Sequence, residues 1–137
     1  MLPLVSLVMK TEQQEQILLM ATVAAFHKHF TPYLAHIPNG GARNPKTGAI
    51  MKKMGVKKGM PDLIYFRARG GYFGLYIEMK RIKGGRLSKD QREVCQRLTD
   101  EGYLVREALG AEQALEMLIE YEEMAPTQQH PYGGLLS

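Results

Sequence analysis

The segment spanning residues 73–80, Phe-Gly-Leu-Tyr-Ile-Glu-Met-Lys, constrains the fold more than any other part of the chain. Side chains along a β-strand alternate between its two faces. One face of this segment is wholly apolar and must lie in a core, since it carries Phe73, Leu75, Ile77 and Met79. The opposite face carries Glu78 and Lys80, which point the same way at the end of the strand. The chain must therefore supply other elements that cover the apolar face.

A second strand precedes this one. Residues 62–67, Asp-Leu-Ile-Tyr-Phe-Arg, are rich in β-branched and aromatic side chains, and the two glycines that follow Arg69 are typical of a hairpin turn. Pairing Asp62 with Lys80 centres an antiparallel hairpin on Gly71. This register predicts that Asp62, Glu78 and Lys80 meet at one end of the sheet.

The remaining patterns predict helices and short strands around the hairpin. Thr11 and Gln14 have the spacing of an N-terminal capping box, and Ser88 and Gln91 repeat it. We expect, in chain order, a helix over about 12–29 that stops before Pro32, a short strand over 33–37, a short helix over 49–54, a helix from the Ser88 cap to about 101, a strand over 103–107 and a helix over 111–123. The expected fold class is α/β, with a small mixed central sheet flanked by helices.

The length of 137 residues suits one domain with its own core. We assign residues 1–10 to an N-terminal extension, residues 11–124 to the domain and residues 125–137 to a disordered tail. A single cysteine, Cys95, excludes an internal disulfide, and no apolar run approaches the roughly 18 residues of a membrane span. These features predict a cytoplasmic protein with no membrane partner and no organic cofactor.

Charge is distributed unevenly along the chain. Residues 1–92 contain 16 Lys and Arg against 5 Asp and Glu, whereas residues 93–137 contain 2 against 9. Cations at this density suit a polyanion, because each neutralised phosphate releases condensed counterions. The candidate DNA-binding residues are Arg43, Lys46, Lys52, Lys53, Lys57, Lys58, Arg81, Lys83 and Arg86. A merely solvated basic face remains the alternative.

Acids are scarce in the basic part of the chain, and two of them fall at the predicted end of the hairpin. The carboxylates of Asp62 and Glu78 would repel each other without a cation between them. Oxygen ligands of this kind suit Mg²⁺ or Mn²⁺ rather than zinc, and the adjacent Lys80 can position a water molecule. An isolated Glu-x-Lys is more simply interpreted as a salt bridge. Its convergence with Asp62 favours a metal site.

Pro61-Asp62 followed by Glu78-Met79-Lys80 resembles the signature of the PD-(D/E)XK nuclease superfamily. More narrowly, the chain resembles the virus-type replication-repair nuclease (VRR-NUC) family in its short stand-alone phage and bacterial form. The resemblance covers about residues 11–120. It rests on five pieces in order: Glu12-x-x-x-Gln16, Ile37-Pro-Asn-Gly-Gly41, Gly55-Val-Lys-Lys-Gly-Met-Pro-Asp-Leu63, Glu78-Met-Lys80 and Leu87-Ser-x-x-Gln91. It implies a restriction-endonuclease-like core.

The resemblance also implies a role for each matching residue. The metal ligands would be Asp62, Glu78, the Met79 main-chain carbonyl and Glu12, the last directly or through water. Lys80 would orient the attacking water and stabilise charge on the phosphate, and Gln91 would approach from the following helix. The reaction would be phosphodiester hydrolysis leaving a 5′-phosphate, in a bacterium or a phage-infected host. Short members of the family are associated with homodimers that cut four-way (Holliday) DNA junctions.

Several of these residues admit a second interpretation. Glu15 competes with Glu12 as the acid of the first helix, and Gln91 can serve only in the capping box with Ser88. Residues 39–41, Asn-Gly-Gly, can form a plain turn or let the backbone approach a phosphate. The four histidines show no ligand spacing with cysteine or acids, which argues against zinc.

Two other functions fit part of the sequence. A non-catalytic DNA-binding or assembly module on the same fold would explain the basic residues but not the three site residues. A nuclease acting on flaps, duplex or RNA fits the charge equally well. Against RNA, the sequence lacks the paired exposed aromatics of an RNA-binding surface.

Overall fold

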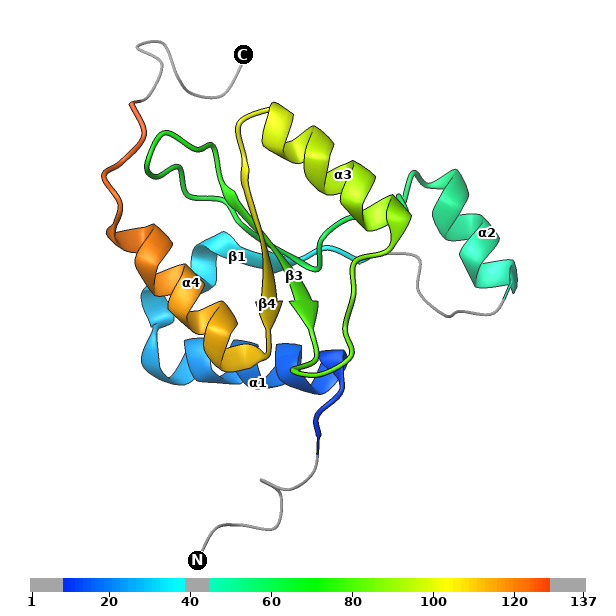
Figure 1. Cartoon of the computed structure of the whole chain (residues 1–137), viewed down its shortest axis with the longest axis horizontal. Helices are drawn as coiled ribbons and strands as arrows, with labels where there is room; N and C mark the ends of the chain where they lie inside the picture. The colour runs from blue at the N-terminus through cyan, green and yellow to red at the C-terminus, as the bar shows by residue number, and fades with distance from the viewer. Residues whose placement is uncertain (1–8, 39–44, 129–137) are drawn as a thin grey trace, which may run out of the picture.

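The computed structural model describes residues 9–38 and 45–128 (Figure 1). Its elements in chain order are α1 (Glu12–Phe26), the 3-10 helix η2 (Lys28–Tyr33), β1 (Leu34–His36), α2 (Pro45–Lys53), β2 (Leu63–Tyr65), β3 (Leu75–Lys80), α3 (Lys89–Asp100), β4 (Leu104–Leu109) and α4 (Ala111–Glu123). Thr11 and Ser88 begin α1 and α3 with the predicted capping boxes. No helix among these residues combines the length and the apolar content that a membrane crossing requires.

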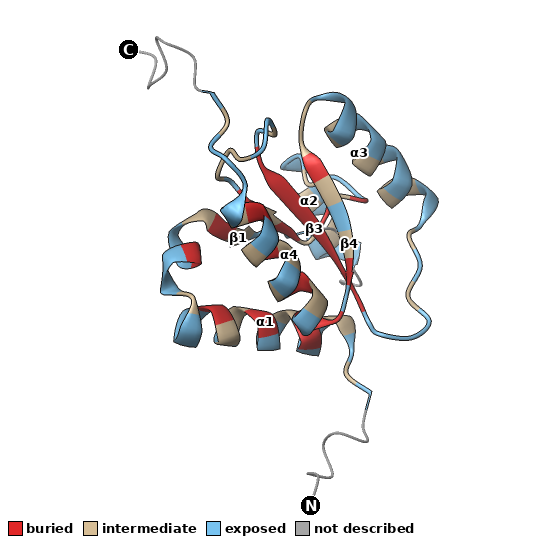
Figure 2. Cartoon of the chain, turned by 60° about the vertical axis from the view of Figure 1, so that its left-hand side comes forward, coloured by how far each residue is buried: buried red, intermediate tan, exposed pale blue. Residues whose placement is uncertain are grey.

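Four strands of the described residues form one sheet in the order β1-β2-β3-β4. β2 pairs antiparallel with β1 and β3, whereas β3 and β4 are parallel. A parallel pair needs a crossover connection, and α3 supplies it. α1 and α4 lie together against one side of the sheet, while α3 lies on the other side of β3 and β4 (Figure 1, Figure 2). This mixed sheet flanked by helices confirms the predicted fold class.

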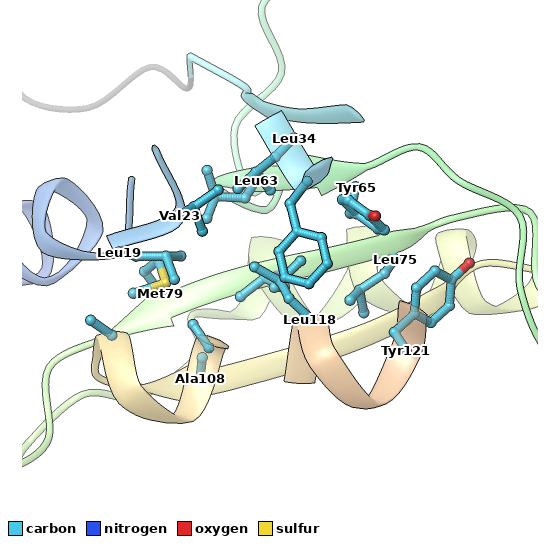
Figure 3. Packing of buried hydrophobic residues seen from close by; sticks show 14 of the residues in the cluster. Leu19, Val23, Leu34, Leu63, Tyr65, Leu75, Met79, Ala108, Leu118 and Tyr121 are labelled. Carbon is cyan, nitrogen blue, oxygen red and sulfur yellow. The ribbon is translucent and has the colours of Figure 1, made fainter. Parts of the chain in front are cut away.

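The core fills the space between the sheet and the layer formed by α1 and α4 (Figure 3). Leu75, Ile77 and Met79 of β3 are at most 1% exposed, as their alternation predicts. Each contributes roughly 1.5–3 kcal/mol by its burial. The prediction that Phe73 joins them is wrong, because β3 begins only at Leu75 and Phe73 is 59% exposed. The main-chain N–H of Phe73 instead donates to the Gly102 carbonyl (3.0 Å) in the turn after α3.

The hairpin register differs from the prediction by two residues. Leu63 pairs with Ile77, so continuing the ladder by one residue places Asp62 opposite Glu78 rather than Lys80. Asp62, Glu78 and Lys80 still lie at the same end of the sheet. The predicted convergence therefore holds with a different pairing.

The two arms of the hairpin are unequal in length. Residues 66–69 lead into the turn and residues 72–74 lead out of it, so the first arm is longer by one residue. In that first arm, Arg67 and Arg69 donate hydrogen bonds to Glu122 on α4 (2.8 and 3.3 Å). The first arm therefore contacts α4 after it leaves the ladder.

Two helix boundaries also differ from prediction. α1 ends at Phe26, and Pro32 lies inside the 3-10 helix η2 rather than beyond a longer α-helix. A 3-10 turn is a common connector after an α-helix. α2 begins at Pro45, four residues before the predicted Ala49. Proline has no N–H to lose at the start of a helix, and its φ already suits one.

The predicted disordered tail begins with a bonded segment. Pro126 forms a bridge with Arg69, and the Thr127 hydroxyl donates to the Tyr72 carbonyl (2.7 Å). Residues 125–128 therefore pack on the hairpin. The rest of that prediction, residues 129–137, lies outside the described residues, as do residues 39–44 with the predicted turn and Arg43.

The loop before β2 packs directly on the start of α3. Gly59 in this loop has φ +91°, and a Cβ built there would lie 2.6 Å from the Asp90 carbonyl oxygen. The Lys58 ammonium also pairs with the Asp90 carboxylate (3.4 Å). Glycine is needed at position 59 both for its left-handed backbone and for this close approach.

Gly59→Ala should lower the free energy of unfolding by about 1–3 kcal/mol. The added methyl group strains the left-handed backbone and also clashes with the Asp90 carbonyl. Gly48→Ala is the matched control. Gly48 lies in α2, and a Cβ there meets nothing within 4 Å, so alanine should preserve or raise stability. Urea unfolding of both variants measures the difference. A Gly59→Ala protein of unchanged stability would contradict the packing of this loop on α3.

Candidate active site

Asp62 is held from both neighbouring strands at the point where β2 begins. Its carboxylate Oδ2 accepts a hydrogen bond from the Met79 main-chain N–H of β3 (2.7 Å). Its main-chain carbonyl accepts from the Ile37 N–H (2.7 Å) and from His36 Nδ1 (2.8 Å), just after and within β1. The sequence predicted Asp62 at this position, and these bonds fix its side chain at the sheet end.

Pro61 explains why the Met79 carbonyl oxygen receives no hydrogen bond from the opposite strand. Continuing the register from the pair Leu63–Ile77 by two residues places Pro61 opposite Met79. Proline has no N–H, so it cannot donate to the Met79 carbonyl as an ordinary ladder residue would. The Met79 N–H that would meet a carbonyl in a longer ladder is satisfied by Asp62 instead. The Pro-Asp pair thus ends the ladder and leaves a main-chain oxygen beside a carboxylate.

Glu78 is only 3% exposed. Its Oε1 accepts from the Gln91 side-chain amide (3.0 Å) and lies 3.5 Å from Lys80 Nζ. Its Oε2 is buried and has no hydrogen-bond partner among the described residues. Burial, together with the nearby charge of Asp62, raises the pKa of Glu78 to about 8, although the Lys80 ammonium opposes the shift.

Lys80 brings three elements together although it is 4% exposed. Its ammonium donates to Gln91 Oε1 on α3 (3.3 Å), and lies 3.5 Å from Glu78 and 3.9 Å from Glu12 on α1. A buried ammonium needs such partners, because removing it from water is costly. The predicted group of Asp62, Glu78 and Lys80 is therefore joined by Glu12 and Gln91.

The Gln91 side chain takes part in the capping box and also contacts the polar cluster. Its oxygen accepts the Ser88 N–H (2.8 Å) and its main-chain N–H donates to the Ser88 hydroxyl (3.1 Å), which completes the capping box. The same side chain bonds Glu78 and Lys80. The start of α3 and the polar cluster thus share one amide.

The structure distinguishes the two acids of the first helix. Glu12 is partly exposed and faces Lys80. Glu15 is buried, and its carboxylate accepts from the Ala111 N–H at the start of α4 (3.3 Å). A carboxylate at a helix N-terminus is favourable. Glu15 therefore joins α1 to α4, and Glu12 is the acid nearest to the cluster.

A groove of about 590 Å³ opens beside these residues. Its lining includes Glu12, Gln16, His36, Asp62 and Met79. His36 is the site residue that sequence reasoning missed, because its partner Asp62 lies far from it in the sequence and is brought close only by the pairing of β1 with β2. Its position one residue before the Ile37-Pro38 piece was the available signal.

The described candidate DNA-binding residues are all exposed: Lys46, Lys52, Lys53, Lys57, Lys58, Arg81, Lys83 and Arg86. α2 carries the first three, buries no residue and projects from the rest of the molecule (Figure 1). Arg81, Lys83 and Arg86 lie in the loop that follows β3. Their exposure suits contact with a polyanion.

The fold thus gathers two carboxylates and a lysine at one end of strands β2 and β3 in a mixed sheet. A family model described as the VRR-NUC domain matches residues 9–112. A solved structure named "VRR_NUC domain protein" superposes with a TM-score of 0.73 at 29% sequence identity, covering 88% of this chain and 95% of that one. A search of curated proteins finds no match. The chain belongs to the VRR-NUC domain family, whose function is of the nuclease type.

The raised pKa of Glu78 predicts how stability depends on pH in metal-free protein. Between the ordinary carboxyl pKa near 4.5 and the folded value of about 8, the unfolded chain has lost a proton that the folded chain keeps. The free energy of unfolding should therefore fall as pH rises through this range, by up to about 1.4 kcal/mol per pH unit.

Glu78→Gln removes the titrating group while keeping its shape. The difference in unfolding free energy between this variant and the unsubstituted protein, measured in urea from pH 5 to 8.5 with EDTA, should grow with pH in favour of the variant. A difference that is constant across the range would rule out the raised pKa.

Proposed function

We propose that this chain is a Mg²⁺-dependent endodeoxyribonuclease, with Mn²⁺ able to substitute, that cuts four-way (Holliday) DNA junctions as a homodimer. The observation that carries the proposal is the cluster of Asp62, Glu78 and Lys80 at one end of β3. In this cluster the buried Glu78 Oε2 lacks a hydrogen-bond partner among the described residues. An orphaned buried carboxylate oxygen beside a second carboxylate is poorly satisfied without a cation.

The donors present fit Mg²⁺. Asp62 and Glu78 offer carboxylate oxygens, and the Met79 carbonyl receives no N–H from Pro61 across the ladder. Hard oxygen donors of this kind are what Mg²⁺ and Mn²⁺ prefer. The described residues hold no group of three or more His, Cys, Asp and Glu side chains able to bind a metal alone. A main-chain oxygen and water must therefore complete the coordination, with Glu12 close enough to Lys80 to bind such a water.

Bound Mg²⁺ would supply Lewis acidity toward the scissile phosphate. Lys80 would hold the attacking water and stabilise the negative charge that develops on phosphorus oxygens. Gln91 and Glu12 would keep the Lys80 ammonium directed into the site. The water oxygen forms a bond to phosphorus as the bond to the 3′ oxygen breaks, leaving a 3′-hydroxyl and a 5′-phosphate. The water proton passes to solvent, and solvent in turn protonates the departing 3′ oxygen.

The substrate preference rests on the family and on charge. A two-fold dimer presents two sites to two like strands of a junction, which one small monomer does not. The exposed lysines of α2 and of the loop after it would follow the phosphates of the arms. Flaps, duplex or RNA are the competing substrates, and a non-catalytic DNA-binding module is the competing function.

Lys80→Met should reduce junction cleavage by at least about a hundredfold, because one preorganised charge stabiliser commonly contributes that much. Methionine keeps the buried volume without the ammonium, so DNA binding and folding should be retained. The assay uses a labelled four-way junction and a matched duplex with Mg²⁺, Mn²⁺ or EDTA. Asp62→Asn is the control that removes a ligand charge.

Metal-dependent, symmetric cutting of the junction alone supports the full proposal. Cutting of flaps, duplex or RNA instead would keep the nuclease and discard the junction. Binding without cutting under any metal would establish the non-catalytic module. Sedimentation of the uncut complex reports whether two copies are present.

Replacing Lys52, Lys53, Lys57 and Lys58 with alanine should weaken DNA binding and flatten its salt dependence. The slope of log affinity against log salt should fall by about 0.9 for each phosphate that the variant no longer neutralises. Lys28→Ala, an exposed lysine beyond the far end of α1, is the control that should leave the slope unchanged. Fluorescence anisotropy between 50 and 200 mM salt, roughly the range in which such interactions weaken, measures both. An unaltered slope in the fourfold variant would place the DNA path elsewhere.

A further inference from the structure

We propose that Gln16 and His36 form a positioning relay that fixes Asp62 for metal binding, an inference that rests on the proposed function. Neither residue needs to touch the metal or the substrate for this role. The relay runs from α1, through the last residue of β1, to the main chain of Asp62. It sets the position of the carboxylate by holding the backbone that carries it.

Asp62 needs such support because it lies where β2 begins. Its carbonyl is held by the Ile37 N–H (2.7 Å) and by His36 Nδ1 (2.8 Å), while its carboxylate is held by the Met79 N–H (2.7 Å). One residue is thus clamped between β1 and β3. The His36 bond is the member of this clamp that comes from the side chain of another residue, so a substitution at His36 removes it without breaking the ladder.

The chemistry of the partners fixes the proton on His36. A carbonyl oxygen can only accept, so Nδ1 must carry a hydrogen and donate it to Asp62. In the present side-chain orientation Gln16 Nε2, a donor, lies 3.0 Å from the same nitrogen. Two donors do not bond each other, so the Gln16 amide must rotate by half a turn to bring its oxygen to this position, where it accepts the same N–H. Gln16 follows Glu12 by about one helical turn, so the same face of α1 serves Lys80 and Asp62.

A relay of this kind acts on metal affinity more than on folding. Hydrogen-bonded neighbours of a metal ligand typically change metal affinity by 10–100-fold when removed. His36 is itself exposed, so its loss removes little buried surface. A ligand carboxylate that is free to rotate must instead be ordered by the cation, and that ordering weakens binding.

The test compares His36→Phe with His36→Asn. Phenylalanine keeps a ring but has no hydrogen-bond donor. Asparagine carries a donor nitrogen separated from Cβ by the same number of bonds as Nδ1 of histidine. Two quantities are measured: the Mn²⁺ dissociation constant by titration, and hydrogen exchange of the Met79 amide in metal-free protein. Exchange of the Leu104 amide, which donates to Gly74 (3.0 Å), is the internal control.

His36→Phe should weaken Mn²⁺ binding about tenfold and speed Met79 exchange by a similar factor. His36→Asn should keep both within about twofold, at equal denaturation midpoints. Unchanged Mn²⁺ affinity and Met79 exchange in His36→Phe would overturn the relay, as would equal damage by asparagine. If the unsubstituted protein binds no Mn²⁺, the proposed metal site fails, and Met79 exchange still decides whether His36 positions Asp62.

Discussion

The burial of Glu78 and Lys80 within β3 is the constraint on which the rest of the structure depends. All six residues of β3 are buried, so its polar face is as enclosed as its apolar face (Figure 2). An ammonium in such a place must have partners, because its desolvation is otherwise uncompensated. α1 supplies Glu12 and α3 supplies Gln91. The placement of both helices is thus coupled to the chemistry of one strand.

Coupling extends to the loop before β2 through α3. Gln91 joins the cluster to the capping box, and Asp90 beside it packs on Gly59. The Gly59-Met60-Pro61-Asp62 run therefore meets α3 at one end and β3 at the other. A change that moves the start of α3 must therefore shift the Gln91 side-chain amide, which contacts Lys80, and also the loop that leads to Asp62. The contacts that hold α3 and the loop in place are consequently also the contacts that position the polar cluster.

The sequence predicted the apolar face of β3, both capping boxes and the convergence of Asp62, Glu78 and Lys80, because these follow from local periodicity and spacing. It did not predict the hairpin register, because the spacing around Gly70 and Gly71 is compatible with more than one pairing of the arms. Alternation also could not show that the polar face of β3 is buried, since that depends on α3 packing over it. The role of His36 was also not predictable, because its partner Asp62 becomes adjacent only when β1 and β2 pair.

The polar cluster and the basic residues of α2 are held with different firmness. The polar cluster stands on the most buried strand, where every neighbour restricts its geometry. The basic residues of α2 stand on a nine-residue helix that buries no side chain. Helices of this length are marginal on their own, so α2 can adjust to a charged surface at little cost. This division suits the proposed DNA cleavage, because phosphate attraction tolerates movement whereas positioning of a scissile bond does not.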